Sequence, residues 1–319
     1  ARLRSLRTRE AKTRAKFLNN VLRGLSQIGD QFVHHPGRGS EPDEGPDTIA
    51  DPDAPGVPAK ELFGRAREAA ALEARSLGFY SRGCLAGGAA LPVDGPAWQV
   101  MRLSRNRMWG HPNLIEFLEK FAKKAPDVGW NGLLVGDLSQ PRGGPMLTGH
   151  ASHQIGLDAD IWLTPMPNRR LSRAEREEMS ATNVVRSDWL DVDETKWTPE
   201  HLEIIKLAAK DRRVQRIFVN AAIKKAICRE ATGDRSWLSK VRPMYGHNYH
   251  FHIRMACPGG DASCADQDPT PPGEGCDASL AYWFSDAVLH PKRKAGGKPK
   301  PPMTMANLPS ECRMVLKSE

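Results

Sequence analysis

The alternation of histidines with apolar residues at 249–255 constrains the fold of this chain more than any other feature. His250 and His252 alternate there with Phe251 and Ile253. On an extended strand the two imidazoles lie on one face, and the apolar side chains lie on the opposite face, which can be buried. We therefore expect a strand that presents two histidines towards one point.

A second strand of the same kind is predicted at 158–163. Asp158 and Asp160 fall on one of its faces, opposite apolar residues. His153 precedes Asp160 by seven positions, which is too far along one straight strand, but Gly156 allows a bend between them. The bend would bring an imidazole and a carboxylate together.

Two histidines and one carboxylate around one point are typical of a catalytic zinc site, because they leave the fourth tetrahedral position open for water. The alternative is that the histidines are separate and form local hydrogen bonds. Buried polar groups cost free energy unless they are paired. Two such patterns on apolar strands of one chain therefore favour the metal site.

These stretches also resemble a known family. The motif Ser-His-Gln-x-Gly-Leu-Asp-x-Asp-Ile at 152–161 and the later His-x-x-His-x-His at 247–252 are similar to those of the penicillin-insensitive murein endopeptidases. This family is grouped with lysostaphin, the D-alanyl-D-alanine peptidases and the sonic hedgehog fold, and its members are zinc peptidases. The resemblance runs from 83 to 312 and includes all six cysteines and the segments 110–112, 217–224 and 241–243.

The resemblance implies a set of site residues. His153, Asp160 and His252 are expected to hold zinc, and His250 is expected to assist catalysis. His150 and His247 also match residues of the family's site, either as further ligands or as groups that orient the ligands.

Two acidic residues are weaker candidates for metal contacts. Asp188 and Asp191 align with a loop that carries possible additional metal contacts in the family. The match there is poor, and an acidic loop is usually only solvated.

The cysteines favour an oxidising compartment. The chain has six, an even number, and no Cys-x-x-Cys pair that would indicate a zinc ribbon. Their spacing alone does not choose among the possible pairings. The family resemblance implies the pairs Cys84 with Cys312, Cys228 with Cys276 and Cys257 with Cys264. We expect a periplasmic protein whose export signal has been removed before Ala1.

Charge is concentrated at the two ends. Of the formal net charge of +8, residues 1–16 contribute +6 and residues 291–319 contribute +5, which leaves −3 for the residues between them. This distribution argues against a nucleic-acid-binding body. Basic ends would instead be attracted weakly to anionic envelope polymers. No run of 18 apolar residues exists that could span a membrane.

The predicted organisation is one catalytic domain with two tails. A basic extension with a Pro/Gly-rich acidic linker occupies 1–58, the peptidase domain occupies 59–290, and a basic Pro/Lys-rich tail at 291–319 is tied back through Cys312. We expect strands near 99, 132, 158, 216 and 249, with a short helix over 60–76 and helices after Pro112, Ser172, Thr198 and Asn220. This irregular order predicts an α+β fold with a mainly antiparallel central sheet, flanked by helices and carrying the zinc site.

The predicted function is zinc-dependent, penicillin-insensitive hydrolysis of peptide cross-links in peptidoglycan. The resemblance implies the D-alanyl-meso-diaminopimelyl bond as the bond that is cleaved. One alternative is a zinc D-alanyl-D-alanine carboxypeptidase, and another is a zinc-containing protein that binds the cell wall without hydrolysis. A nucleic-acid-binding protein that uses the basic arm is a third alternative, and it predicts salt-sensitive binding to DNA.

Overall fold

The computed structural model describes residues 54, 56–291 and 301–318. A compact unit of residues 48–295 and 302–319 contains every element named below. The predicted basic arm, nearly all of its linker and residues 292–300 of the C-terminal tail lie outside the described residues, so the predicted domain boundaries stay predictions. In the described ranges, no helix has both the length and the apolar character that a membrane span requires.

A seven-stranded sheet forms the centre of this unit. Four of its six pairings are antiparallel, and the pairings β10–β9 and β5–β7 are parallel. In spatial order the strands are β10 (Val241–Pro243), β9 (Val214–Val219), β11 (His250–Met255), β8 (Asp158–Trp162), β7 (Leu133–Val135), β5 (Trp98–Val100) and β4 (Asp94–Gly95). The predicted α+β class with a mainly antiparallel sheet is confirmed.

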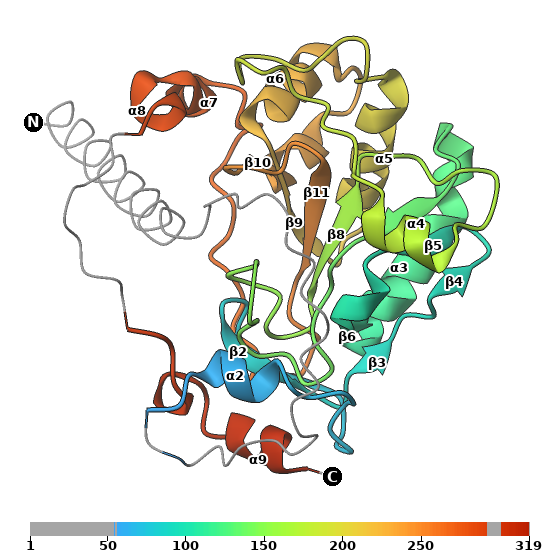
Figure 1. The fold of residues 1–319 in the computed structure, drawn as a ribbon. Coiled ribbons are helices and arrows are strands. Elements are labelled where there is room, and N and C mark those ends of the chain that lie inside the picture. The colour runs from blue at the N-terminus through green and yellow to red at the C-terminus, as the bar shows by residue number, and fades with distance from the viewer. Residues whose placement is uncertain (1–53, 55, 292–300, 319) are drawn as a thin grey trace, which may run out of the picture. The chain divides into compact units, whose positions relative to one another are not determined.

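The two alternating stretches of the sequence form neighbouring strands, β8 and β11. They pair antiparallel with His252 opposite Asp160, and Phe218 of β9 lies opposite His252 on the other edge of β11. The alternate residues Phe251 and Ile253 are fully buried on the other face. Strands β8, β9 and β11 run side by side at the centre of Figure 1. The histidines of the predicted site therefore lie together on the polar face of these strands.

Three helices supply much of the core beside this sheet: α3 (Pro112–Lys124), α5 (Pro199–Lys210) and α6 (Ala221–Glu230). Their apolar side chains form one buried cluster with Phe251 and Ile253. The ring of Phe121 meets that of Phe251 edge-on, with centroids 6.5 Å apart. The predicted starts of the three helices are confirmed, because each helix begins directly after His111, Thr198 or Asn220.

A smaller layer packs around a hairpin of β1 (Arg75–Phe79) and β2 (Arg82–Ala86). With α2 (Ala59–Phe63) and α9 (Cys312–Lys317) it forms a second apolar cluster, and these three labelled elements, α2, β2 and α9, gather at the lower end of Figure 1. The predicted helix over 60–76 is wrong beyond Phe63, where α2 ends. Helix propensity is a weak preference there, and the residues from Arg75 onward pair with β2 instead.

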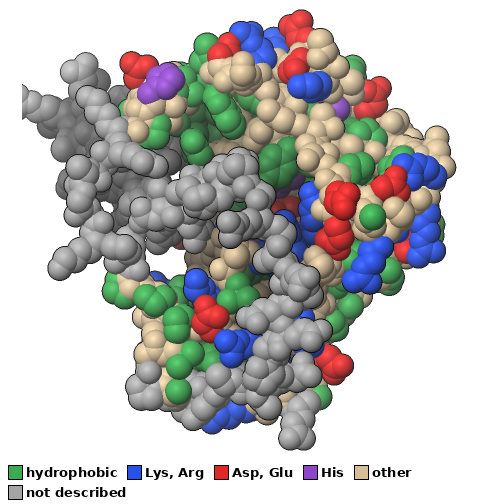
Figure 2. All heavy atoms as spheres, viewed as in Figure 1, with side chains coloured by type: hydrophobic (Ala, Val, Ile, Leu, Met, Phe, Trp, Pro, Cys, Tyr) green, Lys and Arg blue, Asp and Glu red, His purple; other side chains and the backbone are tan. Residues whose placement is uncertain are grey.

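The remaining elements are short and connect these layers. They are β3 (Ala89–Ala90), β6 (Trp109–Gly110), α4 (Arg173–Glu178), α7 (Ala278–Ala281), α8 (Asp286–Leu289) and the 3₁₀ turns η1 (Leu103–Arg105), η2 (Ala125–Val128), η3 (Ser236–Lys240), η4 (Tyr282–Phe284) and η5 (Met305–Asn307). The helix predicted after Ser172 is α4, and a capping box at Ser172 opens it. On the face drawn in Figure 2, acidic and basic side chains of the described residues are interspersed, with no extended patch of one sign.

Candidate metal centre

Asp160 lies at the centre of the polar face with four imidazoles around its carboxylate. Its Oδ1 lies 3.5 Å from His153 Nε2 and 3.3 Å from His252 Nδ1. Its Oδ2 lies 3.5 Å from His150 Nδ1 and 3.6 Å from His250 Nε2. Asp160 is only 4% exposed. The structure therefore brings five of the predicted site residues into one small, buried volume.

A bend in the chain before β8 positions His153. The φ angles of His153 and Gly156 are 68° and 71°, both in the left-handed region. A side chain at position 156 would not fit, because its Cβ would lie 2.8 Å from the backbone nitrogen of His111. The backbone N–H of His153 donates to Asp158 Oδ2 at 3.0 Å. The bend predicted from the glycine is thus confirmed.

The ligand atoms of this centre fit a metal ion. Among the described residues, His150, His153 and Asp160 offer ligand atoms that all lie within 4.8 Å of one another. Both ring nitrogens of His153 and Oδ1 of Asp160 are buried and have no hydrogen-bond partner among the described residues, whereas buried polar atoms are nearly always paired. Bonds of about 2.0–2.1 Å in a tetrahedron place ligand atoms ~3.3 Å apart, which matches the spacing around Asp160.

Asp137 holds the far side of the His150 ring. Its Oδ2 lies 3.0 Å from His150 Nε2 and accepts hydrogen bonds from Arg105 and Arg107. Asp137 is 4% exposed and lies two residues after the end of β7. Because the carboxylate engages Nε2, it turns Nδ1 of His150 towards Asp160.

His247 flanks the centre without touching Asp160. Its Nδ1 lies 2.8 Å from the carbonyl oxygen of Tyr245, and its ring centroid lies 4.8 Å from that of His250. Its φ angle is 51°, another left-handed non-glycine residue. These contacts place His247 beside His250 rather than among the atoms that face Asp160.

Burial and mutual contact set the charge states of the group. Burial lowers the pKa of His250 and of His252 to about 4, and that of His247 to about 3. Burial raises the pKa of Asp160, but the imidazoles of His250 and His153 outweigh it and hold that pKa well below its ordinary value. At neutral pH the carboxylate is ionised and these three rings are neutral, which are the forms that bind metals.

The His150 ring responds differently. Burial lowers its pKa, but the carboxylates of Asp160 and Asp137 outweigh burial and raise the pKa above its ordinary value. The two carboxylates, one on each side of the ring, therefore stabilise a positive charge on His150.

Asp158 and Arg254 form a second layer that was not assigned a role from the sequence. Asp158 is fully buried, and Arg254 donates to both of its oxygens, from Nε at 2.8 Å and from Nη2 at 3.1 Å. Asp158 Oδ1 also lies 3.0 Å from Nε2 of His252. The sequence offered one signal for this pair, the alternation of side chains along each strand. Asp158 lies on the same strand face as Asp160, and Arg254 lies on the same strand face as His252. Their pairing in the sheet register puts them side by side.

The acidic loop residues lie in contacts of their own. Asp188 forms an ion pair with Arg186, and Asp191 forms ion pairs with Lys225 and Arg229. Neither belongs to the metal-sized group found among the described residues. A metal-binding role for them stays a weak prediction.

Comparison with known proteins agrees with this geometry. The family model described as penicillin-insensitive murein endopeptidase matches residues 76–317. The chain belongs to this family. It is 44% identical over 246 residues to the penicillin-insensitive murein endopeptidase of Haemophilus influenzae. The aligned residues cover 77% of this chain and 84% of that enzyme. It is 42% identical over 243 residues to the enzyme of that name from Klebsiella pneumoniae, with 76% and 86% covered.

Membership of the murein endopeptidase family confirms the resemblance inferred from the motifs at 152–161 and 247–252. It also makes the chain a peptidase by family. The three disulfides agree with the pairing that the resemblance implied, since Cys84 bonds Cys312, Cys228 bonds Cys276 and Cys257 bonds Cys264.

Two other histidines have structural roles in this family member. His111 caps α3, its Nδ1 accepting from the backbone N–H of Asn113 at 3.1 Å. His201 is buried in the first turn of α5, where its Nδ1 lies 3.1 Å from the backbone nitrogen of Thr198.

Proposed function

We propose that this protein is a zinc-dependent endopeptidase that hydrolyses the D-alanyl-meso-diaminopimelyl cross-links of peptidoglycan. The observation that carries the proposal is the set of buried, unpartnered ligand atoms around Asp160 in a chain of the murein endopeptidase family. The three disulfides suit an oxidising compartment, and the periplasm, where peptidoglycan lies, is the compartment we propose.

Under this proposal, His153, Asp160 and His252 hold the ion, and His150 is available as a fourth ligand. When bound, Zn²⁺ supplies a Lewis acid that polarises the scissile carbonyl and lowers the pKa of a bound water to about 7. Asp158 fixes His252 through the ring nitrogen that faces away from Asp160, and such outer contacts orient the ligands of metal sites.

His250 is the proposed general base. Its ring is buried, and because its pKa is lowered to about 4 it is neutral at pH 7 and can accept a proton. It lies beside the ligand set, with Nε2 facing the same oxygen of Asp160 that His150 faces. The protonated ring can then stabilise the oxyanion of the tetrahedral intermediate or return its proton to the leaving amine. His247 packs against His250 and restricts its orientation.

Incubation with purified sacculi, followed by mass analysis of the released muropeptides, tests the function directly. We expect cross-linked dimers to be converted to monomers, with activity abolished by a chelator and restored by zinc. Loss of only a terminal D-alanine would identify a carboxypeptidase, and binding to sacculi without any cleavage would identify a non-hydrolytic wall-binding protein. Penicillin should leave the activity unchanged, since the proposed site uses no serine nucleophile.

A further inference from the structure

Arg105 stands at the edge of the metal centre on an unusually constrained turn. It ends η1, and the residues on either side of that turn, Arg102 and Asn106, have left-handed φ angles of 57° and 50°. The turn is held from both sides. The guanidinium of Arg102 donates to the carbonyl of Met179 at 2.9 Å, and the side chain of Asn106 accepts from the indole N–H of Trp109 at 2.8 Å.

The positive charge of Arg105 exceeds what its partner can neutralise. Arg105 Nη1 and Arg107 Nη1 both bond Oδ2 of Asp137, at 3.0 and 2.9 Å, so two guanidiniums share one carboxylate. Arg107 is buried and also donates to Thr148. The side chain of Arg105 is 48% exposed. Within the described part of the chain, its Nε and Nη2 have no hydrogen-bond partner, so they can receive an anion from solvent.

The exposed guanidinium is close to the reacting centre. The oxygen of Asp137 that Arg105 bonds also lies 3.0 Å from Nε2 of His150, whose Nδ1 faces Asp160. Tyr249 lies beside His250: the two ring centroids are 4.7 Å apart, and Tyr249 is 43% exposed. Burial and the charge of Asp160 raise the pKa of Tyr249, while Arg105 opposes that rise. Tyr249 therefore retains its proton and can donate a hydrogen bond.

We propose that Arg105, with the hydroxyl of Tyr249, forms a carboxylate subsite that recognises the residue on the amine side of the scissile bond. This inference rests on the proposed function. In a D-alanyl-meso-diaminopimelyl cross-link, the carbon that bears the scissile amide nitrogen also bears a free carboxylate. A guanidinium with two free donor groups suits a carboxylate, because the pair can form two parallel charge-assisted hydrogen bonds. Held there, the carboxylate fixes the amide above the metal centre.

The test uses two synthetic cross-linked peptides that differ only at this carboxylate, which is free in one and a carboxamide in the other. With the zinc-loaded full chain, we expect Arg105→Ala to lower kcat/KM for the free carboxylate ~10- to 100-fold, mainly through KM, since a charged hydrogen bond is lost. Arg105→Lys should recover part of the loss, because lysine keeps the charge but not the paired donors. On the carboxamide, wild type and both variants should be equal.

The matched control is Arg169→Ala, which removes an exposed arginine paired with Glu175 and should behave as wild type on both peptides. Bound zinc per molecule should be the same in all four proteins. An equal loss on both peptides would mean that Arg105 acts only through Asp137 and His150, and no loss on either would mean that no subsite exists. Each of these results overturns the inference while leaving the peptidase in place. If the wild type cleaves neither peptide, the proposed function fails and the subsite fails with it.

Discussion

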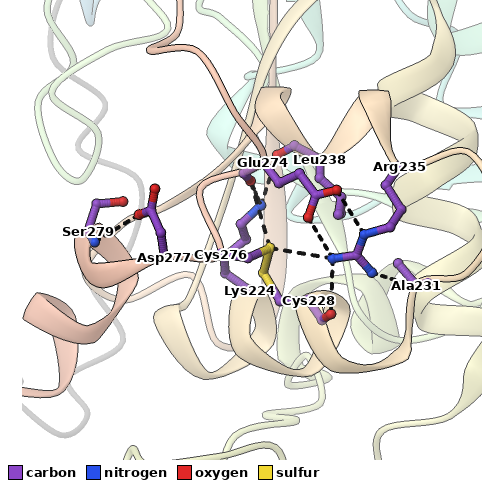
Figure 3. Close-up of a disulfide and its surroundings, with 9 residues drawn as sticks. All are labelled: Lys224, Cys228, Ala231, Arg235, Leu238, Glu274, Cys276, Asp277 and Ser279. Carbon is purple, nitrogen blue, oxygen red and sulfur yellow. Dashed lines mark hydrogen bonds and ion pairs between the residues drawn. A yellow bond between two sulfur atoms is a disulfide. The ribbon is translucent and has the colours of Figure 1, made fainter.

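Two polar clusters in this molecule invite comparison, because each contains buried polar groups and satisfies them differently. At the metal centre, Asp160 and His153 have buried atoms that lack a hydrogen-bond partner within the described part of the chain. Around the Cys228–Cys276 disulfide, shown in Figure 3, the fully buried Lys224 donates to the carbonyls of Leu238 and Glu274 at 2.8 and 2.6 Å.

The neighbour of Lys224 in Figure 3 is satisfied in the same way. Arg235 bonds both carboxylate oxygens of Glu274, at 2.9 and 2.7 Å, and also the carbonyls of Ala231 and Cys228. This difference indicates which of the two clusters binds a ligand. A buried charge with protein partners fixes the fold, whereas buried ligand atoms without them imply that something else completes the site.

The largest effect should come from His252→Ala. We expect loss of most bound zinc together with essentially all hydrolysis, because the ion that supplies the nucleophile is gone. Zinc per molecule and muropeptide release are the measurements, with His290→Ala at an exposed position as control. Retention of stoichiometric zinc by a folded His252→Ala variant would contradict its role as ligand.

His250→Ala should lower the rate by about 10²- to 10⁴-fold and leave zinc bound, since it removes a general base or an oxyanion stabiliser rather than a ligand. Zinc content and single-turnover rates separate the two roles. If this variant is metal-free while His252→Ala keeps its zinc, the two assignments must be exchanged.

Asp158→Asn should weaken zinc binding by about 10- to 100-fold, because the His252 ring loses the carboxylate that orients it. Competition with a chelator measures this directly. The matched control is Asp211→Asn, since Asp211 is held by Arg213 through the same two-point contact but lies partly exposed and remote from the centre. Equal zinc affinity in both variants would make Asp158 merely structural.

The smallest effect on catalysis is expected at the other cluster. Lys224→Met should leave activity unchanged and reduce the free energy of unfolding at pH 7 by about 1–3 kcal/mol for each carbonyl that loses its donor. Denaturant unfolding and muropeptide release test the two statements. A loss of hydrolysis in a folded Lys224→Met variant would contradict the purely structural role given to the Lys224 cluster.

The pH dependence sharpens the same contrast. Burial, reinforced by Arg242, lowers the pKa of Lys224 in the folded protein to about 7, from an ordinary value of 10.5. Between these pH values the unfolded chain binds more protons than the folded one, so this lysine makes stability rise as pH rises from about 7. Unfolding measured at pH 7 and pH 9 should show that rise in the wild type and a smaller one in Lys224→Met.

The two strands of the centre and the bend before β8 were predictable from the sequence because their signals are local. The alternation around His250 and the bend at Gly156 follow from neighbouring residues alone. The link from Asp158 to Arg254 spans 96 positions, and it exists only because the register of β8 against β11 pairs them. Asp137 lay in a predicted strand segment, but nothing local connects it to His150. The hairpin from Arg75 was missed because its pairing overrides helix propensity.

The Cys84–Cys312 bond joins residues 228 positions apart, and every residue of the metal centre lies between them. The catalytic unit is thus a closed covalent loop with both ends of the backbone leaving from one junction. A protease that cuts one surface loop inside it would yield two polypeptides that still migrate as one molecule until a reductant is added. A single cut would therefore leave every residue of the metal centre covalently attached to the rest of the chain.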